Sequence, residues 1–361
     1  MRHHRQMEGV IEGVVRAVGT SMRLDVDEQS QIGGARRAAV TLAHGRGLSS
    51  DAVGRLALVV TEAATNIVRH GGRGAIILRT LSGGGTAAVE MLALDKGPGI
   101  YDVPRAMRDG YSTAGTAGKG LGAISRLSEV FSIHSQRGAG TVVLARVGER
   151  TGPSNRARRV ASIDDRVGAV CAPLRGEVAC GDAWCIIVGP KRVAVMLVDG
   201  LGHGPEAAAA ADAATATFPS LAGQSPDVAI AGFAAALRNT RGAALSMAII
   251  DEAARVVRFG GVGNVDGRVL STGPTEYLVP QNGIVGMGTP GVRCSTASWP
   301  AGARLVMHSD GIGARWRVDA YAGLANAHPA LLAGVIYRDF ARDRDDATVL
   351  VVSENVPDVQ Q

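Results

Sequence analysis

Two side chains in the first part of the sequence, Glu62 and Asn66, have types and a spacing that suit phosphoryl-transfer chemistry. They lie four positions apart in a segment with helical spacing of apolar residues, so a helix would present both on one face. A carboxylate placed there can accept a proton from an attacking hydroxyl, and an amide oxygen one turn further on can bind Mg²⁺. The same short pattern also occurs on ordinary exposed helix faces, so taken alone it leaves both interpretations open.

Asp95 and the glycines after it form a second motif. Asp95 ends a mostly apolar run over residues 89–94 and precedes Gly97-Pro-Gly99. A carboxylate at a strand end can accept a hydrogen bond from the exocyclic amino group of adenine and so distinguish adenine from guanine. The glycines let the backbone approach a ligand closely. A Gly-Pro turn with a capping Asp is the alternative interpretation.

A glycine-rich segment with Gly118, Gly120 and Gly122 opens a predicted helix over residues 117–127. Backbone N–H groups and the positive end of a helix can bind phosphates at such a place. A single glycine-rich loop is weak support for any function. The order and spacing of the three motifs together predict a nucleotide site.

Aspartates mark the ends of apolar runs in the second half of the chain. Asp199 ends the run over residues 193–198, and Asp310 ends the run over residues 305–309. Carboxylates are ligands that Mg²⁺ or Mn²⁺ prefers, and two such ions can activate water to attack a phosphoserine or phosphothreonine directly. Each Asp-Gly pair alone also indicates a turn. The candidate ligands are Asp182, Asp199, Asp310 and Asp345.

The elements that position these residues fall into two groups. In the first, residues 28–46 and 51–70 are predicted helices, the second with Ser50 or Asp51 as N-cap and Gly71-Gly72 at its end. Strands are expected over residues 76–80, 87–94, 130–135 and 141–147. Together, these helices and strands predict an α+β sandwich in which helices cover one face of a mostly antiparallel sheet.

The second group is rich in short strands. Two helices, predicted over residues 205–217 and 226–239, lie together between strands, which fits a β-sandwich with helices packed outside. Residues 149–159 are polar, contain Gly-Pro and lack periodicity, so they are the best linker candidate. The domains would span residues 1–148 and 163–355, with the linker at 149–162. Strands are expected near residues 166–172, 176–188, 192–198, 243–250, 255–260, 265–270, 303–308 and 347–352.

Composition narrows the class of protein. A length of 361 residues favours two domains, 46% hydrophobic residues suffice for their cores, and 4% aromatic residues argue against a base-stacking nucleic-acid platform. The net charge of +5 comes mostly from Arg and forms no dense basic stripe. Four cysteines without C-x-x-C spacing indicate small buried side chains in a reducing compartment. With no long apolar run and no signal-peptide pattern, we expect a cytoplasmic protein that binds neither nucleic acid nor membrane.

Residues 10–147 resemble the anti-sigma-factor serine kinases of the GHKL (Bergerat-fold) ATPase superfamily, and among them the RsbT-type switch kinases. The stretches 95–100 and 109–122 carry most of the resemblance. It implies binding of ATP with Mg²⁺, and a Ser or Thr of a small STAS-domain antagonist protein as substrate. The implied roles are Glu62 as catalytic base, Asn66 as Mg²⁺ ligand, Asp95 on adenine, Gly97 and Gly99 in the base pocket, Gly118, Gly120 and Gly122 in the phosphate lid, and Thr141 at the adenine.

Residues 163–353 resemble the metal-dependent PPM-type protein phosphatases, specifically the SpoIIE and RsbX branch. The resemblance makes Asp199 the ligand that bridges two Mn²⁺ or Mg²⁺ ions, with the Gly200 carbonyl beside it. Asp182 would serve one metal, and Asp310 and Asp345 the other. His203 lies two residues further from Asp199-Gly200 than the acid histidine of the eukaryotic members, so a turn or helix-cap role is an equal interpretation.

Two complete residue sets in one chain predict a bifunctional switch enzyme. The first half would phosphorylate, and the second dephosphorylate, Ser or Thr of a STAS-type regulatory protein in a sigma-factor or stress-signalling pathway. In the alternative, the first half is a non-catalytic, ATP-gated module that holds a sigma factor or other partner, and the phosphatase is the only enzyme. A third interpretation keeps the kinase and makes the second half a scaffold. The resemblance also allows a homodimer.

Overall fold

The computed structural model describes residues 15–81, 87–108, 120–149, 163–288 and 291–354. The chain forms two compact units. Unit I comprises residues 19–172 and 311–361, and unit II comprises residues 1–18 and 173–310. Each unit therefore combines segments that are far apart in the sequence.

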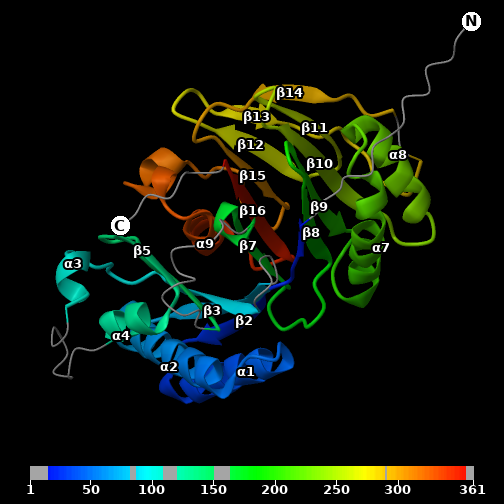
Figure 1. Ribbon diagram of the computed structural model, residues 1–361. Helices are drawn as coiled ribbons and strands as arrows, with labels where there is room; N and C mark the ends of the chain where they lie inside the picture. The colour runs from blue at the N-terminus through cyan, green and yellow to red at the C-terminus, as the bar shows by residue number, and fades with distance from the viewer. Residues whose placement is uncertain (1–14, 82–86, 109–119, 150–162, 289–290, 355–361) are drawn as a thin grey trace, which may run out of the picture. The chain divides into compact units, whose positions relative to one another are not determined.

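The centre of unit I is an antiparallel five-stranded sheet with the order β2-β3-β4-β6-β5. Figure 1 labels its strands β2, β3 and β5. Side chains alternate between its two faces, and on one face Ile76, Met91 and Val143 join the helices in a buried core. The mixed α+β class predicted from the sequence is confirmed. The strands are β2 (Met22–Val26), β3 (Gly74–Leu81), β4 (Ala88–Asp95), β5 (Val130–Gln136) and β6 (Gly140–Gly148).

Helices α1 (Gln29–Gly45) and α2 (Ser50–Asn66) pack on that face of the sheet (Figure 1). The N-cap of α2 is Ser49, whose hydroxyl accepts a hydrogen bond from the Ala52 amide, so the predicted cap was one or two residues too late. The helix continues as a π-helical turn, η1 (Ile67–Gly71). Gly72, with a φ of 74°, then ends it as predicted.

The opposite face of this sheet is covered too, so the expectation of helices on one face only was wrong. Helix α9 (Pro329–Phe340) contacts β4 and β6, and also contacts the paired strands β7 (Val167–Ala172) and β16 (Ala347–Ser353). A Cβ added to Gly334 of α9 would lie 3.1 Å from Val142 and 3.3 Å from Leu94. This layer comes from the far end of the chain, so local periodicity could not predict that it packs on this sheet.

Short elements complete unit I. Of the helix predicted over residues 117–127, residues 120–127 form α4, and residues 117–119 lie outside the described part of the chain. The short elements are α3 (Val103–Ala106), α4 (Gly120–Leu127), α6 (Ile163–Arg166), η2 (Val318–Ala320) and η3 (Leu324–Asn326).

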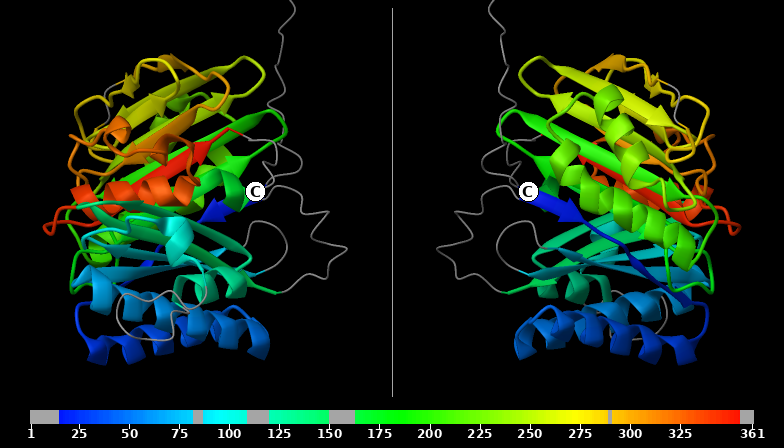
Figure 2. Two further views of the ribbon diagram at one scale, coloured as in Figure 1. Left: turned by 90° about the vertical axis from the view of Figure 1, so that its left-hand side faces the viewer. Right: turned by 90° about the vertical axis from the view of Figure 1, so that its right-hand side faces the viewer.

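Unit II contains an antiparallel six-stranded sheet with the order β1-β8-β9-β10-β11-β14, and a ladder with the order β13-β12-β15. Helices α7 (Pro205–Leu221) and α8 (Pro226–Ala236) pack on the larger sheet, as Figure 2 shows. Both helices lie close to their predicted positions, whereas the strand predicted at 176–188 begins only at Asp182. The strands are β1 (Val15–Val18), β8 (Asp182–Val188), β9 (Arg192–Gly200), β10 (Ala243–Asp251), β11 (Val256–Val262), β12 (Asp266–Leu270), β13 (Glu276–Leu278), β14 (Ser295–Ser298) and β15 (Arg304–His308).

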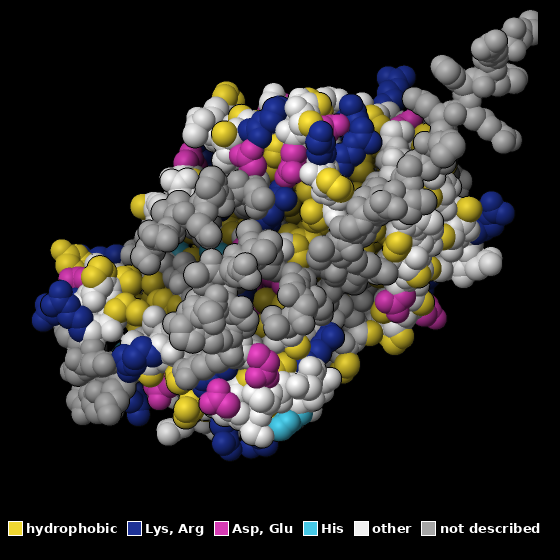
Figure 3. All heavy atoms as spheres, viewed as in Figure 1, with side chains coloured by type: hydrophobic (Ala, Val, Ile, Leu, Met, Phe, Trp, Pro, Cys, Tyr) yellow, Lys and Arg dark blue, Asp and Glu magenta, His cyan; other side chains and the backbone are white. Residues whose placement is uncertain are grey.

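The surface seen in Figure 3 intersperses basic and acidic side chains. In the part of the chain that the structure describes, no helix is both long enough and apolar enough to cross a bilayer. Cys171 and Cys185 are buried as expected. Cys180 is half-buried and Cys294 is exposed, so the expectation of four buried cysteines was wrong for these two.

Candidate active sites

Glu62 and Asn66 lie one turn apart near the end of α2, and both side chains are half-buried. Directly after Asn66 the helix widens into the π turn η1, a rare geometry that is often found at functional sites. The turn brings Gly71 against Asp95, because a Cβ on Gly71 would lie 2.5 Å from the Asp95 Cβ. The helix motif and the Asp95 motif are therefore connected through one turn of backbone.

Asp95 is held at the end of β4 by backbone amides. Its Oδ1 accepts hydrogen bonds from the Gly97 amide at 2.9 Å and the Thr141 amide at 3.3 Å. Thr141 is also the register partner of Asp95 across β4 and β6. Among the described residues, both hydrogen bonds to this side chain end on Oδ1, which leaves Oδ2 available to a ligand donor.

The electrostatic surroundings of Asp95 pull its pKa in two directions. Burial raises the pKa, while the Gly97 and Thr141 amides and the charges of Arg338 and His70 lower it, and the net direction is upward. A donor such as an amino group would stabilise the ionised carboxylate and oppose this shift.

The predicted glycines serve close backbone packing around this pocket. A Cβ on Gly97 would lie 2.7 Å from both the Gly71 Cα and the His70 carbonyl oxygen. Gly99 has a φ of 72°, and a Cβ there would overlap the Gln136 carbonyl. Both positions therefore require glycine before any ligand is considered.

The glycine-rich motif approaches Asn66. A Cβ added to Gly120, the first residue of α4, would lie 3.1 Å from Oδ1 and 3.2 Å from Nδ2 of Asn66. Gly122 is buried one half-turn further along α4, and Gly118 lies outside the described residues. The structure thus brings the Asn66 amide next to the helix start that was predicted to bind phosphates, and an amide oxygen beside a helix N-terminus is donor chemistry that fits a nucleotide phosphate with its cation.

In unit II, Asp182 and Asp199 stand opposite each other on β8 and β9. Opposed residues of an antiparallel pair point to the same face, and like charges in that position destabilise the pairing. A divalent cation would remove this repulsion, so the donor chemistry fits a metal site. The Gly200 amide donates to the Gly181 carbonyl at 2.9 Å, which fixes the backbone between the two carboxylates.

Neutral side chains orient the predicted aspartate ligands. Ser309 is fully buried, and its hydroxyl donates to Oδ2 of Asp182 at 2.7 Å. The side-chain amide of Asn264, in the turn between β11 and β12, donates to Oδ2 of Asp310 at 2.6 Å. A metal ligand is commonly fixed by such an outer hydrogen bond.

Asp345 belongs to unit I and precedes β16. Its Oδ1 accepts the Asp346 amide at 2.9 Å, while Asp346 itself is buried. A Cβ on Gly311 would overlap the Asp346 carbonyl, so that position requires glycine as well.

Among the described residues, no three or more His, Cys, Asp or Glu side chains group closely enough to hold one metal ion.

His203 does not cap α7, because the N-cap of that helix is Gly204. Its Nδ1 instead forms a 2.7 Å interaction with Oε1 of Glu177, and the imidazole is half-exposed. The cap interpretation of His203 was therefore wrong.

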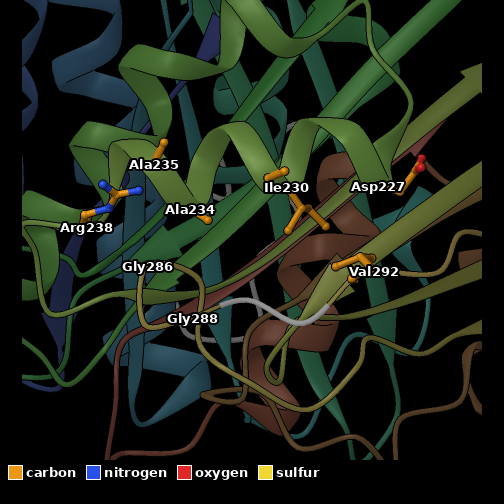
Figure 4. A pocket seen from close by; sticks show the side chains of 10 residues that line it. Asp227, Ile230, Ala234, Ala235, Arg238, Gly286, Gly288 and Val292 are labelled. Atoms are coloured by element: carbon orange, nitrogen blue, oxygen red, sulfur yellow. The ribbon is translucent and has the colours of Figure 1, made fainter.

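A cavity of about 350 Å³ lies in unit II between α8 and the residues Gly286, Gly288, Gly291 and Val292. Asp227 and Arg238 lie near its two ends, and Ile230, Ala234 and Val292 lie between them (Figure 4). None of the predicted site residues lines it. The cavity is therefore separate from the sites described above.

Two family matches agree with the two sets of motifs. Residues 26–147 match the family described as histidine kinase-like ATPase domain, and residues 189–354 match the family described as Stage II sporulation protein E (SpoIIE). The fold and the sites thus define an ATPase of the kinase type joined to a phosphatase of the PPM type.

Over 91 residues the chain is 37% identical to the serine/threonine-protein kinase RsbT of Bacillus subtilis (strain 168), an alignment that spans 25% of this chain and 68% of RsbT. The chain belongs to the RsbT family of serine/threonine-protein kinases. Over 138 residues it is also 27% identical to the phosphoserine phosphatase RsbX of the same organism, which spans 38% of this chain and 69% of RsbX. The predicted fusion of an RsbT-like kinase to a PPM-type phosphatase is confirmed.

Among solved structures, a chain from work on the bacterial stressosome as a modular system adapted to control secondary messenger signalling is 29% identical. It covers 52% of this chain and 97% of its own length, with a TM-score of 0.49.

Several residues near the sites had no signal in the sequence. Asn264 follows Gly263, whose φ of 101° indicates a turn but no function. Arg338 lies on α9, a helix that the sequence did not predict, and donates to the Asp95 carbonyl at 3.4 Å. Pro329 at the helix start and the apolar run after it were the available signals for α9.

Proposed function

We propose that this protein is a switch enzyme that both phosphorylates and dephosphorylates Ser or Thr on STAS-type regulatory proteins. The similarity to a kinase, RsbT, and to a phosphatase, RsbX, on one chain supports the two directions of the switch. The observation that carries the proposal is the coexistence of two oxygen-rich sites, with Asn66 against Gly120 in one and Asp182 opposite Asp199 in the other.

In the kinase reaction, Glu62 would accept the proton of the substrate hydroxyl while the hydroxyl oxygen bonds to the γ-phosphorus and ADP leaves. Asp95 would accept a hydrogen bond from the adenine amino group, which fixes the base at the end of β4. Asn66 and the backbone near Gly120 would hold the phosphate end, where bound Mg²⁺ supplies neutralisation of negative charge. The protein's contribution is positioning and electrostatic stabilisation.

In the phosphatase reaction, Asp182, Asp199, Asp310 and Asp345 would hold two divalent ions, with the Gly200 carbonyl beside Asp199. Such ions supply the Lewis acidity that makes water nucleophilic near neutral pH. Ser309 and Asn264 would keep the carboxylates of Asp182 and Asp310 in fixed orientations. Water would displace the serine or threonine oxygen directly, and no phosphoenzyme would form.

The test uses the full chain and a panel of purified STAS-domain proteins. Each is incubated with ATP and Mg²⁺, and incorporation of phosphate is measured by intact-mass spectrometry. The phosphorylated product, and a phosphoserine form of each panel member prepared independently, are then incubated with the same protein and Mn²⁺ but without ATP. We expect a gain and then a loss of one phosphoryl group on at least one panel member.

The outcomes separate the interpretations. Release without transfer, with ATP still bound, would support an ATP-gated binding module whose only enzyme is the phosphatase. Transfer without release would support the scaffold interpretation of the second half. Neither transfer nor release across the panel would overturn the proposal.

A further inference from the structure

Helix α9 is an internal element of unit I, although it lies outside residues 26–147, which match the ATPase family. All residues from 329 to 338 are buried. A helix that is apolar on every side is one that packs on several neighbours at once. Gly334 allows close approach to β4 and β6, and Gly168 on β7 has its Cα directly against the backbone of Pro329 and Ala330.

Arg338 connects this helix to the end of β4. Its side chain is 3% exposed, and its Nη1 donates to the Asp95 carbonyl oxygen at 3.4 Å. The guanidinium is held in place by Asp339, with Nε and Nη2 donating to the two carboxylate oxygens at 2.8 Å and 2.7 Å. A bidentate pair of this kind fixes the direction of the guanidinium plane.

Asp339 is itself fixed to the sheet of the ATPase region. It accepts a hydrogen bond from the Tyr321 hydroxyl at 2.7 Å, and the Tyr321 ring packs edge-on against His134 of β5 at 6.1 Å. Two residues earlier in the helix, the Tyr337 hydroxyl accepts a hydrogen bond from Arg23 of β2 at 2.9 Å. Contacts to β2, β4 and β5 therefore hold α9 in one position.

The side chain and the backbone carbonyl of Asp95 have different partners. Leu94 contacts the α9 side of the sheet, so the Asp95 side chain, one residue on, points to the α2 side, where Gly71 meets it. Its carbonyl oxygen is the atom that Arg338 contacts. Arg338 thus acts on the backbone that carries the carboxylate, without entering the base pocket.

We infer that Arg338 is a positioning residue of the nucleotide site, so that α9, from the end of the chain, completes the pocket of the ATPase region. The inference rests on the proposed role of Asp95 as the residue that binds adenine. The charge of Arg338 also favours the ionised form of Asp95, together with His70 from η1. The ATP affinity and the preference for ATP over GTP should both depend on a residue some 240 positions away from Asp95.

The experiment measures binding of a fluorescent ATP analogue to the full-length protein, with competition by ATP and by GTP. The variants are Arg338→Gln, Arg338→Lys and Asp95→Asn, and the control is Arg317→Gln, whose exposed side chain pairs with Asp319 in the same unit. We expect Arg338→Gln to weaken ATP binding about tenfold and to reduce the ATP-to-GTP ratio. Arg338→Lys keeps the charge and should recover most of that loss, and Arg317→Gln should bind as the wild type does.

Hydrogen exchange of the wild-type protein supplies a readout that needs no variant to fold. Saturating ATP should slow exchange of the amides over residues 331–341, and GTP at the same concentration should not. A folded Arg338→Gln variant with wild-type affinity, or an unchanged exchange rate in α9, would overturn the inference. If Asp95→Asn also binds ATP normally, the proposed nucleotide site fails as well; if only Asp95→Asn loses ATP, the site stands and the inference about Arg338 does not.

Discussion

Asp182 and Asp199 are direct partners in the antiparallel pairing of β8 and β9, so two carboxylates face the same side of the sheet at its end. Asp182 is 1% exposed and accepts a hydrogen bond from Ser309, and Asp199 is half-buried. Adjacent carboxylates of this kind are unfavourable without a cation, so we expect divalent ions to stabilise unit II.

Asp199→Asn should therefore separate stability from activity. Without metal, we expect the melting temperature to rise slightly, because the variant loses a like-charge repulsion of about 0.2–1 kcal/mol. With Mn²⁺, the wild type should gain stability and the variant should not. Turnover of a phosphoserine peptide should fall by at least about 100-fold. Asp212→Asn, an exposed aspartate on α7, is the matched control; equal responses of the two variants would contradict a ligand role for Asp199.

Gly311 and Gly313 offer a matched pair next to the predicted ligand Asp310. A Cβ at Gly311 would overlap the Asp346 carbonyl, whereas at Gly313 the nearest atom is 3.5 Å away. Gly311→Ala should therefore lower the free energy of unfolding by about 1–3 kcal/mol and reduce phosphatase turnover, because the strand-end loop must shift. Gly313→Ala should change the free energy of unfolding and the turnover only slightly. Urea unfolding measures the stability and a phosphopeptide assay measures the turnover. A Gly311→Ala variant with wild-type stability and turnover would show that the loop has room to move.

Glu62→Gln tests the kinase base without changing the size of the side chain. We expect ATP affinity to stay within about twofold and phosphoryl transfer to fall by about 10²–10⁴-fold, the usual contribution of a general base. Single-turnover kinetics measure the rate of phosphoryl transfer, and binding of an ATP analogue measures the affinity. The control is Asp27→Asn, an exposed carboxylate before α1. Loss of ATP binding in Glu62→Gln would assign this residue to the binding of nucleotide instead.

Gly120→Ala probes the contact between the glycine-rich motif and α2. The new Cβ would lie 3.1 Å from Asn66 Oδ1, so the amide must turn away from the place where a phosphate-bound cation would lie. We expect about tenfold weaker binding of Mg²⁺-ATP, and a smaller change for nucleotide without metal. Gly54→Ala on α2, where nothing lies within 4 Å, should keep the affinity and stabilise the helix by about 1 kcal/mol. Similar affinities for both variants would place Asn66 away from the phosphates.

The sequence predicted the elements that are marked by local signals. Helices α1 and α2 follow from apolar spacing, and α2 also has a serine near its start and glycines at its end. The central strands β3, β4, β5 and β6 follow from apolar runs and alternation. The approach of Gly120 to Asn66 and of Thr141 to Asp95 agrees with the family resemblance, which assigns these residues to one nucleotide site.

The rest depends on contacts between distant segments. Arg79, Glu90 and Arg146 alternate with apolar residues, a pattern that indicates an exposed polar face of a sheet. In the structure all three are buried. No local pattern encodes this burial, because α6 and α9, which lie near this face, come from later in the chain. The contact between Asn264 and Asp310 joins distant segments in the same way, whereas α9 had local signals that were overlooked and only its packing on β4 and β6 depends on distant contacts.

Glu90 should make unit I sensitive to acid. Burial alone would raise its pKa, but the guanidinium groups of Arg79 and Arg146, at 2.7 Å on its two oxygens, lower the pKa to about 2. Because the folded pKa lies below that of the unfolded chain, the carboxylate stabilises the fold above about pH 4.5, and this stability is lost as the pH falls from there toward 2. The free energy of unfolding should fall by an amount on the order of 3 kcal/mol over this pH range.

Urea unfolding of unit I, followed at pH 7, 4 and 3, measures this loss directly. Glu90→Gln should be destabilised by about 3–5 kcal/mol at pH 7, because it leaves two buried guanidinium groups without their carboxylate, and its stability should then vary less with pH in the acid range. Replacing Arg79, Glu90 and Arg146 together by apolar residues of similar size should restore stability and abolish this part of the acid sensitivity. Glu149→Gln is the comparison, because hydrogen bonds from Ser49 also lower the pKa of that carboxyl but little burial opposes them, so its loss should remove a smaller part of the acid sensitivity. A wild-type acid transition that persists unchanged in the triple variant would assign the sensitivity to other carboxylates.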